Sequence, residues 1–335
     1  MDPRELHARR RARERQLRRR RRTWLIASAA LLAVGVVAVA LASGGGRSTA
    51  SREPAPGGPA PRPPERRASV PKPAGPTPAP APAPAPAPTP AESARRHVDA
   101  IPILMYHVIA PPPPGAPFPG LYVPAAEFKA QMHALEGAGW HAVTMDQILA
   151  HWRRGASLGP GRPIVLSFDN GYRSQYTEAL PVLRALGWVG VENIQLTGLP
   201  PSQGGLTRSQ VRGLLHAGWE LDTQGRSHTD LGKLDAAGLR AEIAAPRRTL
   251  RRRFGVRVNW FCYPSGQYDA TVMAAVRAAG YVGSTTVMPG WARRTDDLYR
   301  LPRLRVLGGT SALALLALIA HARAQPPPPP AYRSS

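Results

Sequence analysis

Residues 164–176, with the sequence IVLSFDNGYRSQY, carry the strongest fold signal in the chain. A β-branched, apolar run ends in an acidic residue and a glycine turn, and the start of an amphipathic segment follows. This pattern predicts a buried strand whose carboxyl end presents Asp169 and Asn170 on a loop. In α/β folds, the loops at the carboxyl ends of strands usually carry the chemistry. We therefore expect this loop to belong to the functional site.

The N-terminal part of the chain has the composition of a membrane-targeting segment. Arginine makes up half of residues 1–22, and residues 24–42 form an apolar run without a charge. Such a run approaches the ~20 residues that cross a bilayer as a helix. The basic flank predicts that the tail 1–22 stays in the cytoplasm, that 23–43 is a transmembrane anchor, and that the rest is exported. We expect a single-pass plasma-membrane protein with an extracytoplasmic domain. The alternative is a signal peptide cleaved after Ala42.

The composition of the rest of the chain limits the extent of the folded domain and the classes of partner. Residues 44–98 are rich in proline and alanine, cannot bury a core, and should form a disordered, extended linker. Residues 99–324 suit one large domain, and the proline-rich tail 325–335 is expected to be disordered. The formal net charge is +23, but the arginine-rich tail lacks interleaved aromatic residues and adjoins the apolar run, so we expect no nucleic-acid partner. A single cysteine, Cys262, excludes an intrachain disulfide.

From residue 101 onward, apolar strands alternate with amphipathic helices. Strands are predicted at residues 101–105, 141–144, 164–168, 190–196, 219–222, 258–263, 283–286 and 304–307. Helices are predicted at residues 125–136, 145–152, 176–186, 207–216, 235–254 and 270–279. This alternation predicts an α/β fold with a parallel sheet and right-handed crossovers. Seven or eight such units favour a barrel over an open sheet.

Four segments together resemble the polysaccharide deacetylases, the NodB-homology family. They are PILMYH at 102–107, SFDNGY at 167–172, WELDTQGRSHTDL at 219–231 and WFCYPSGQYD at 260–269. The first is similar to the branch of the family whose first strand ends in Met-Tyr-His, and LPR at 301–303 adds a weaker match. The resemblance covers residues 101 to about 320. It implies a distorted (β/α) barrel of about seven units, which agrees with the strand and helix pattern.

The resemblance also implies a reaction, the hydrolysis of N-acetyl groups on an envelope glycan such as a peptidoglycan-like polysaccharide. In the family a divalent metal, zinc or a similar ion, polarises the acetyl carbonyl and lowers the pKa of a bound water. A carboxylate takes the proton of that water, and an imidazole protonates the leaving amine. The resemblance assigns the role of the base to Asp169 and the role of the acid to His107. From the residues alone, Asp169 is also a common turn former and His107 a common core histidine.

The metal ligands implied by the resemblance map to Asn170, Gln224 and His228. The family has Asp and His at the first two positions, so two of three ligands are neutral amides here. Amide oxygens bring no charge and suit Zn²⁺ poorly, so the metal site is expected to be weak or lost. Two interpretations follow: an N-deacetylase with weakened metal dependence, or a catalytically inactive glycan-binding protein of the same fold.

The expected substrate contacts come from the same motifs. They are Tyr172, Tyr263, Pro264 and Arg303. Cys262 stands where the family has an arginine that orients the catalytic carboxylate, and Arg303 is a candidate substitute counter-charge for Asp169.

Overall fold

The computed structural model of the protein describes residues 98–197, 199 and 204–333. The predicted basic tail, membrane anchor and linker lie outside these residues, apart from the linker's last residue. Within the described part of the chain, no helix is long and apolar enough to cross a membrane.

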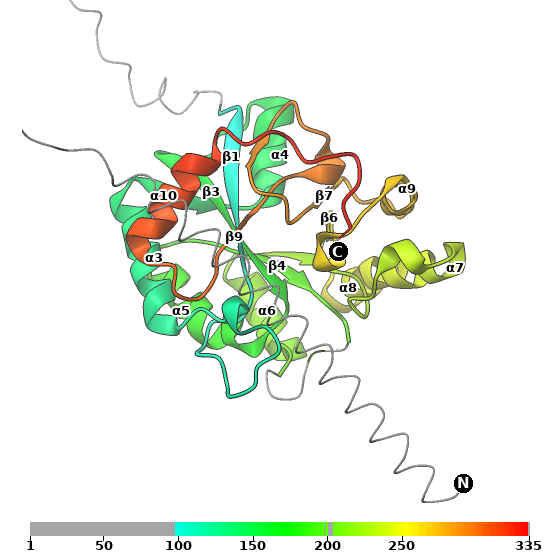
Figure 1. The fold of residues 1–335 in the computed structure, drawn as a ribbon, viewed down its shortest axis with the longest axis horizontal. Coiled ribbons are helices and arrows are strands. Elements are labelled where there is room, and N and C mark those ends of the chain that lie inside the picture. The colour runs from blue at the N-terminus through cyan, green and yellow to red at the C-terminus, as the bar shows by residue number, and fades with distance from the viewer. Residues whose placement is uncertain (1–97, 198, 200–203, 334–335) are drawn as a thin grey trace, which may run out of the picture. The chain divides into compact units, whose positions relative to one another are not determined.

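A curled sheet forms the centre of the domain (Figure 1), with neighbouring strands in the order β7-β6-β5-β4-β3-β1-β8. In addition, β2 pairs with β3 and β9 pairs with β1. The strands are β1 Ala100–Tyr106, β2 Trp140–Val143, β3 Arg162–Asn170, β4 Val191–Ile194, β5 Glu220–Thr223, β6 Trp260–Cys262, β7 Gly283–Thr285, β8 Trp291–Arg293 and β9 Leu304–Arg305. The β1–β8 pairing is antiparallel, and the other strand pairings are parallel. The α/β prediction with a parallel sheet is therefore confirmed.

The short segment that ends in β9 connects the two sides of the curled sheet. Leu301 forms a parallel bridge with Thr285 at the end of β7. Three residues later, Leu304 pairs with Leu104 of β1. The chain between these two pairings therefore spans the gap between β7 and β1, as expected for a distorted barrel. Arg303 lies on this spanning segment.

Helices surround the sheet (Figure 1). They are α3 Ala125–Gly137, α4 Met145–Arg154, α5 Leu180–Ala185, α6 Arg208–His216, α7 Ala236–Leu239, α8 Ala245–Phe254, α9 Ala270–Ala278 and α10 Ala312–Ala322. Two predicted helices contain a π-helical turn, Gln175–Ala179 before α5 and Arg240–Ala244 before α8. Thr207 caps the start of α6, because its side chain accepts a hydrogen bond from the backbone of Gln210.

Two apolar layers attach these helices to the sheet. In one layer, Phe128 of α3, Leu183 of α5 and Leu315 of α10 pack with Leu104 and Phe168 of the central strands. In the other, α7, α8 and α9 contribute residues that pack on Leu221 of β5 and Phe261 of β6. A third apolar cluster, which includes Ile103 of β1, Val165 of β3 and Ile148 of α4, packs on the other face of these strands. The polar site therefore lies at the carboxyl ends of the strands.

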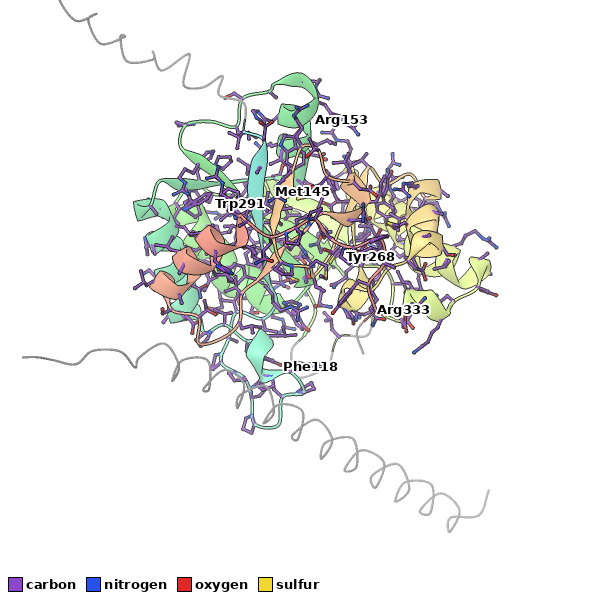
Figure 2. The ribbon with its side chains drawn as sticks, turned by 45° about the horizontal axis from the view of Figure 1, so that its top comes forward. Phe118, Met145, Arg153, Tyr268, Trp291 and Arg333 are labelled. Carbon is purple, nitrogen blue, oxygen red and sulfur yellow. The ribbon has the colours of Figure 1, made fainter. Side chains whose placement is uncertain are left out.

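Three features differ from the sequence prediction. Helix α10 was not predicted, because its almost uniformly apolar sequence shows no amphipathic period. Strand β8 was not predicted, because its three residues are too short to show a period. Residues 325–333, expected to be disordered, pack on the domain instead. Tyr332 and Tyr268 exchange two backbone hydrogen bonds of 2.9 Å, and Arg333 forms an ion pair with Asp269 at 2.6 Å. Figure 2 shows Tyr268 and Arg333 on the same side of the domain. The segment has no fold signal of its own because its order comes from partners elsewhere in the chain.

Candidate functional site

Asp169 lies at the carboxyl end of β3 and is bound on both oxygens. Arg303 donates from Nη1 to Oδ1 at 2.7 Å and from Nη2 to Oδ2 at 2.9 Å. Asn193 of β4 also donates to Oδ1 at 2.9 Å, and the Sγ of Cys262 lies 3.4 Å from Oδ2. Asp169 is 1 % exposed and Arg303 is 0 % exposed. The expected counter-charge role of Arg303 is confirmed by this paired geometry.

The ion pair controls the charge of the carboxylate. Burial would raise the pKa of Asp169, but the charge and hydrogen bonds of Arg303, the proximity of His107 and the Asn193 bond together hold that pKa well below its usual range. Arg303 is fixed in turn, since its Nε donates to the carbonyl of Thr286 at 2.8 Å. The ion pair therefore favours the anionic form of Asp169, and β4 and the segment before β9 set the orientation of its carboxylate.

His107 follows β1 and faces Asp169. Its Nε2 lies 4.0 Å from Oδ2 of Asp169, and its Nδ1 is buried without a hydrogen-bond partner in the structure. Burial lowers the pKa of His107 to about 4, and the attraction of Asp169 only partly opposes this shift. The imidazole is thus neutral at pH 7. The structure therefore places the predicted base, Asp169, beside the predicted acid, His107. The carboxyl group of Asp169 is anionic, and the ring of His107 is neutral.

The buried side chain of Gln175 connects the carboxyl ends of β1 and β3. Nε2 of Gln175, in the π-helical turn after β3, donates to the backbone carbonyls of His107 at 2.9 Å and Asp169 at 2.8 Å. Gln175 is fully buried. No sequence motif marks Gln175, although π-helical turns are often found at functional sites.

Asn170 and Gly171 turn the chain sharply away from the strand. Both have positive φ values, 77° and 87°, a conformation that Asn tolerates and Gly adopts freely. A Cβ at Gly171 would lie 2.7 Å from Cγ1 of Ile194, so the glycine is needed for this close approach. The side chain of Asn170 donates from Nδ2 to Oε1 of Gln195 at 3.0 Å. This hydrogen bond between two amides fixes Asn170 at the inner edge of β4.

Gln224 and His228 follow β5. Gln224 is 3 % exposed, and its Oε1 is buried without a hydrogen-bond partner in the structure. His228 has a positive φ of 57°. Burial lowers the pKa of its ring, and the nearby charge of Asp169 opposes that shift. The loop that holds His228 is itself fixed by Glu242, whose carboxylate accepts from the backbone and the hydroxyl of Ser227 at 2.9 and 2.8 Å.

These residues do not fit a catalytic zinc ion. Asn170 and Gln224 offer only neutral amide oxygens, and His228 offers one imidazole. The neighbouring carboxylate of Asp169 is already neutralised by Arg303. Among the described residues, no group of three or more His, Cys, Asp or Glu side chains is placed to hold a metal ion. Zinc sites in proteins are built from thiolates, imidazoles and carboxylates, so this donor set lacks the required charge.

The predicted substrate contacts lie in different places. Tyr172 is 8 % exposed and packs with Val108 and Tyr122 beside the site. Tyr263 is not brought to the site: its ring is fully buried in the layer under α7–α9, and its hydroxyl donates to the carbonyl of Tyr299 at 2.9 Å. Pro264 is also buried. The side chain of Arg303 has no exposed surface and binds Asp169 and Thr286, so a contact of Arg303 with substrate stays a prediction.

Asn193 and Gln195 of the β4 region were missed by sequence reasoning. Both are buried, at 3 % and 5 % exposure, and they bind Asp169 and Asn170 respectively. A weak signal for them existed, since Asn193 and Gln195 stand two positions apart in VENIQ at residues 191–195, although Glu192 breaks a strict alternation of apolar and polar residues. A polar residue at every second position of an otherwise buried strand indicates a polar inner face.

Comparisons with known proteins show which sequences this chain is similar to. Residues 157–284 match the sequence profile described as Polysaccharide deacetylase. The Bacillus subtilis (strain 168) protein YxkH, whose name provisionally assigns it as a polysaccharide deacetylase, is 29% identical over 221 residues, 65% of this chain and 76% of that protein. The poly-β-1,6-N-acetyl-D-glucosamine N-deacetylase of Escherichia coli (strain K12) is 36% identical over 69 residues, 21% of this chain and 10% of that protein.

A solved structure gives the same comparison for the fold. The Streptococcus pyogenes deacetylase PplD, in complex with acetate, superposes with a TM-score of 0.60 at 24% identity. The match covers 66% of this chain and 98% of that one. At this level of identity the likeness concerns the fold.

Proposed function

We propose that this chain, which belongs to the polysaccharide deacetylase family, binds an N-acetylated envelope glycan and does not hydrolyse it by a zinc-dependent route. The observation that carries this proposal is the donor set. Asn170 and Gln224 replace two charged or strongly binding ligands by amides, and the Asn170 amide already bonds to Gln195. Losing even an outer partner of a metal site costs ~10–100-fold in affinity or activity, and two direct ligands are changed here.

The glycan as ligand is supported by the family and by the relatives. The name of the Escherichia coli relative states that it acts on poly-β-1,6-N-acetyl-D-glucosamine. In this chain the loops after β1, β3 and β5 carry polar side chains at one end of the curled sheet, where α/β proteins bind their ligands. Gln224 Oε1, buried and without a partner in the structure, is one acceptor that an amide or hydroxyl group could satisfy.

A second candidate is a weakened N-deacetylase. The observation that favours it is the 4.0 Å approach of His107 Nε2 to Asp169 Oδ2, which keeps the two acid–base groups of the family together. The low pKa of His107 opposes this candidate, because a general acid must carry a proton near the operating pH.

One experiment separates the two candidates. The full-length protein is titrated calorimetrically with the hexamer of N-acetylglucosamine, and acetate release is measured with added Zn²⁺ and with EDTA. We expect binding without acetate release under either condition. Acetate release that needs Zn²⁺ and is abolished by His107→Gln, with binding retained, would replace our proposal by the hydrolase. Absence of binding to the hexamer would overturn both candidates.

We further propose that the domain acts outside the plasma membrane. This rests on the sequence alone, through the basic tail 1–22 and the apolar run 24–42. An anchor followed by a proline-rich linker would hold the domain within reach of envelope polymers.

A further inference from the structure

Two neighbouring helices of the domain carry only positive charge. Helix α6 contains Arg208 and Arg212, α8 contains five arginines between residues 247 and 253, and neither helix has an acidic residue. Helix α3, in contrast, carries Glu127 and Glu136 with Lys129. Because α3 mixes acidic and basic residues, the high arginine content of the chain does not by itself explain why the charged residues of α6 and α8 are all basic. The surface of α6 and α8 is therefore a candidate site for an anion.

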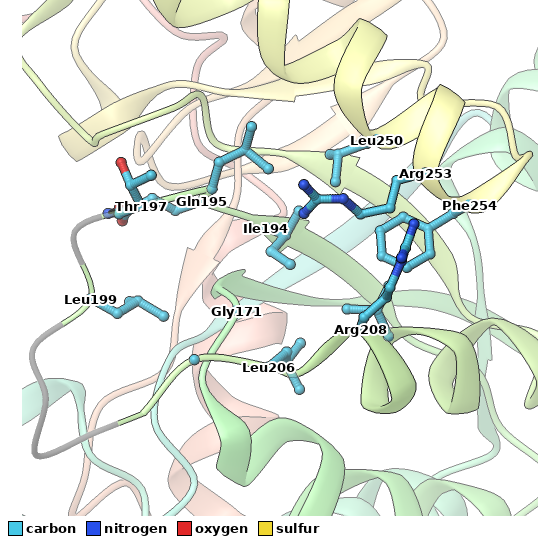
Figure 3. A pocket seen from close by; sticks show the side chains of 13 residues that line it. Gly171, Ile194, Gln195, Thr197, Leu199, Leu206, Arg208, Leu250, Arg253 and Phe254 are labelled. Carbon is cyan, nitrogen blue, oxygen red and sulfur yellow. Dashed lines mark hydrogen bonds between the residues drawn. The ribbon is translucent and has the colours of Figure 1, made fainter.

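A cavity of about 250 Å³ lies where α6 and α8 meet β4 (Figure 3). Ile194, Leu250 and Phe254 form part of an apolar wall, and Arg208 and Arg253 line the same cavity. Figure 3 shows both arginine side chains extending from their helices toward this space. Neither guanidinium forms an ion pair with a described carboxylate. The cavity thus combines an apolar wall with two cations that have no protein counter-charge in this part of the chain.

The cavity adjoins the site that contains Asp169. Gly171, two residues after Asp169, lines it, and so does Gln195, which accepts the hydrogen bond of Asn170. A polymer bound at the Asp169 site would pass the cavity with a neighbouring sugar. Because drug-sized ligands occupy sites of ~300–1,000 Å³, a cavity of this size suits one sugar or its substituent.

We infer that this cavity is a subsite for a carboxylate-bearing sugar of the bound glycan. Guanidinium groups bind carboxylates through paired hydrogen bonds, and the apolar wall offers a surface for the face of a sugar ring. A flexible phosphate polymer would need the charges but not the wall, so the combination favours a sugar acid. The inference deepens the proposed glycan binding and rests on it.

The test compares two hexasaccharides that share N-acetylglucosamine. One is the neutral N-acetylglucosamine hexamer, and the other is a hyaluronan hexasaccharide, in which N-acetylglucosamine alternates with glucuronic acid. We expect the full-length protein to bind the hyaluronan hexasaccharide at least about 10-fold more tightly at low salt, because charge-assisted hydrogen bonds contribute more than neutral ones. Arg208→Gln with Arg253→Gln should remove this preference and leave affinity for the neutral hexamer within about 2-fold.

The matched control removes the same charge from the other side of α8. Arg248 and Arg252 line a different cavity, and Arg248→Gln with Arg252→Gln should lower hyaluronan binding by less than about 3-fold, since exposed charges at a distance are screened by salt. Equal losses in the two double variants would overturn the subsite and indicate non-specific attraction. Equal affinity of the wild-type protein for the two sugars would overturn it as well.

The two proposals fail in different ways. If the neutral hexamer binds without any gain from carboxylates, the subsite is wrong and the proposed glycan binding stands. If only hyaluronan binds, and Arg208 and Arg253 are required, the cavity is confirmed as a sugar-acid site while neutral N-acetylglucosamine fails as the ligand of the Asp169 site. Melting temperatures of both double variants within about 2 °C of wild type confirm that each is folded, since surface substitutions usually change stability little.

Discussion

Arg303 and Asp169, 134 positions apart in the chain, form a two-point ion pair at the centre of the site, with N–O distances of 2.7 and 2.9 Å. Both side chains are withdrawn from solvent. The pair connects the end of β3 to the segment that spans β7 and β1. It therefore links the orientation of the site carboxylate to the closure of the curled sheet.

Removing Arg303 should strongly destabilise the fold. Arg303→Met leaves the buried carboxylate of Asp169 without its counter-charge, which typically costs about 3–5 kcal/mol. Urea unfolding followed by circular dichroism measures the change. The double variant Arg303→Met with Asp169→Asn should recover much of the loss, because it also removes the buried charge. A loss below about 1 kcal/mol in the single variant would show that Asp169 is not an anion in the folded protein.

Because of His107, the free energy of unfolding should depend on pH below about pH 6.5. Burial lowers the pKa of His107 to about 4, whereas an unfolded chain binds this proton near pH 6.5. The unfolded state therefore takes up the proton first, and stability falls as the pH drops from 6.5 to 4, by up to about 3 kcal/mol. His107→Gln should flatten the curve of unfolding free energy in this window.

The comparison with His107→Gln also separates this effect from that of Glu220, a buried group whose contribution to stability has the opposite pH dependence. Burial raises the pKa of Glu220 to about 7, which lowers stability as the pH rises, but Glu220 is present in both proteins. The difference between the two curves therefore reports His107. A difference that does not change with pH would contradict the neutral, buried imidazole.

Restoring the ligands should create a metal site. Asn170→Asp with Gln224→His should raise Zn²⁺ affinity by roughly 10²-fold or more, because a carboxylate and an imidazole replace two amides. The positive φ of Asn170 is tolerated by Asp, so the turn should be kept. Calorimetry with Zn²⁺ measures the gain, and His228→Ala added to the pair should cancel it. Tight stoichiometric zinc in the unaltered protein would instead show that the amides are adequate ligands.

The membrane topology should place the folded domain outside the cell. Protease added to intact protoplasts is expected to degrade residues 99–333 and to leave the tail 1–22 protected, since the arginine-rich flank keeps it in the cytoplasm. Immunoblots against an epitope at each end report the two parts, with a cytoplasmic protein as the control for intact cells. Recovery of the whole chain in the soluble cytoplasm would contradict both the anchor and the envelope glycan as ligand.

Several local features were predictable from the sequence because they depend on neighbours in the chain. The apolar run before Asp169 is long and uniform enough to indicate a buried strand, and Asn170 with Gly171 marks its sharp turn. Thr207 three residues before Gln210 specifies a helix start. The predicted strand bounds are mostly within two residues of those observed, since hydrophobic pattern and breaker residues act locally.

The sequence does not show which side chains of β6 point toward the site. Its three residues are all buried, so no exposed face marks which side chains point inward. Phe261 and Tyr263 point into the outer apolar layer, while Cys262 points to Asp169. The sequence motif suggested Tyr263 as a ligand contact, but a strand covered on both faces has no period that fixes its inner side.

Most of the strands and helices were predictable from the sequence, although β8 and α10 were not. The sequence also predicted that Asp169, Asn170, Gln224 and His228 lie at or after strand ends. The residues that surround these four side chains depend on how the strands come together in the folded protein. Arg303 reaches Asp169 because the segment before β9 bridges β7 and β1, and Asn193 and Gln195 reach the site because β4 lies beside β3. Partners separated by so many positions leave no local pattern, since their approach depends on how the whole sheet curls and closes.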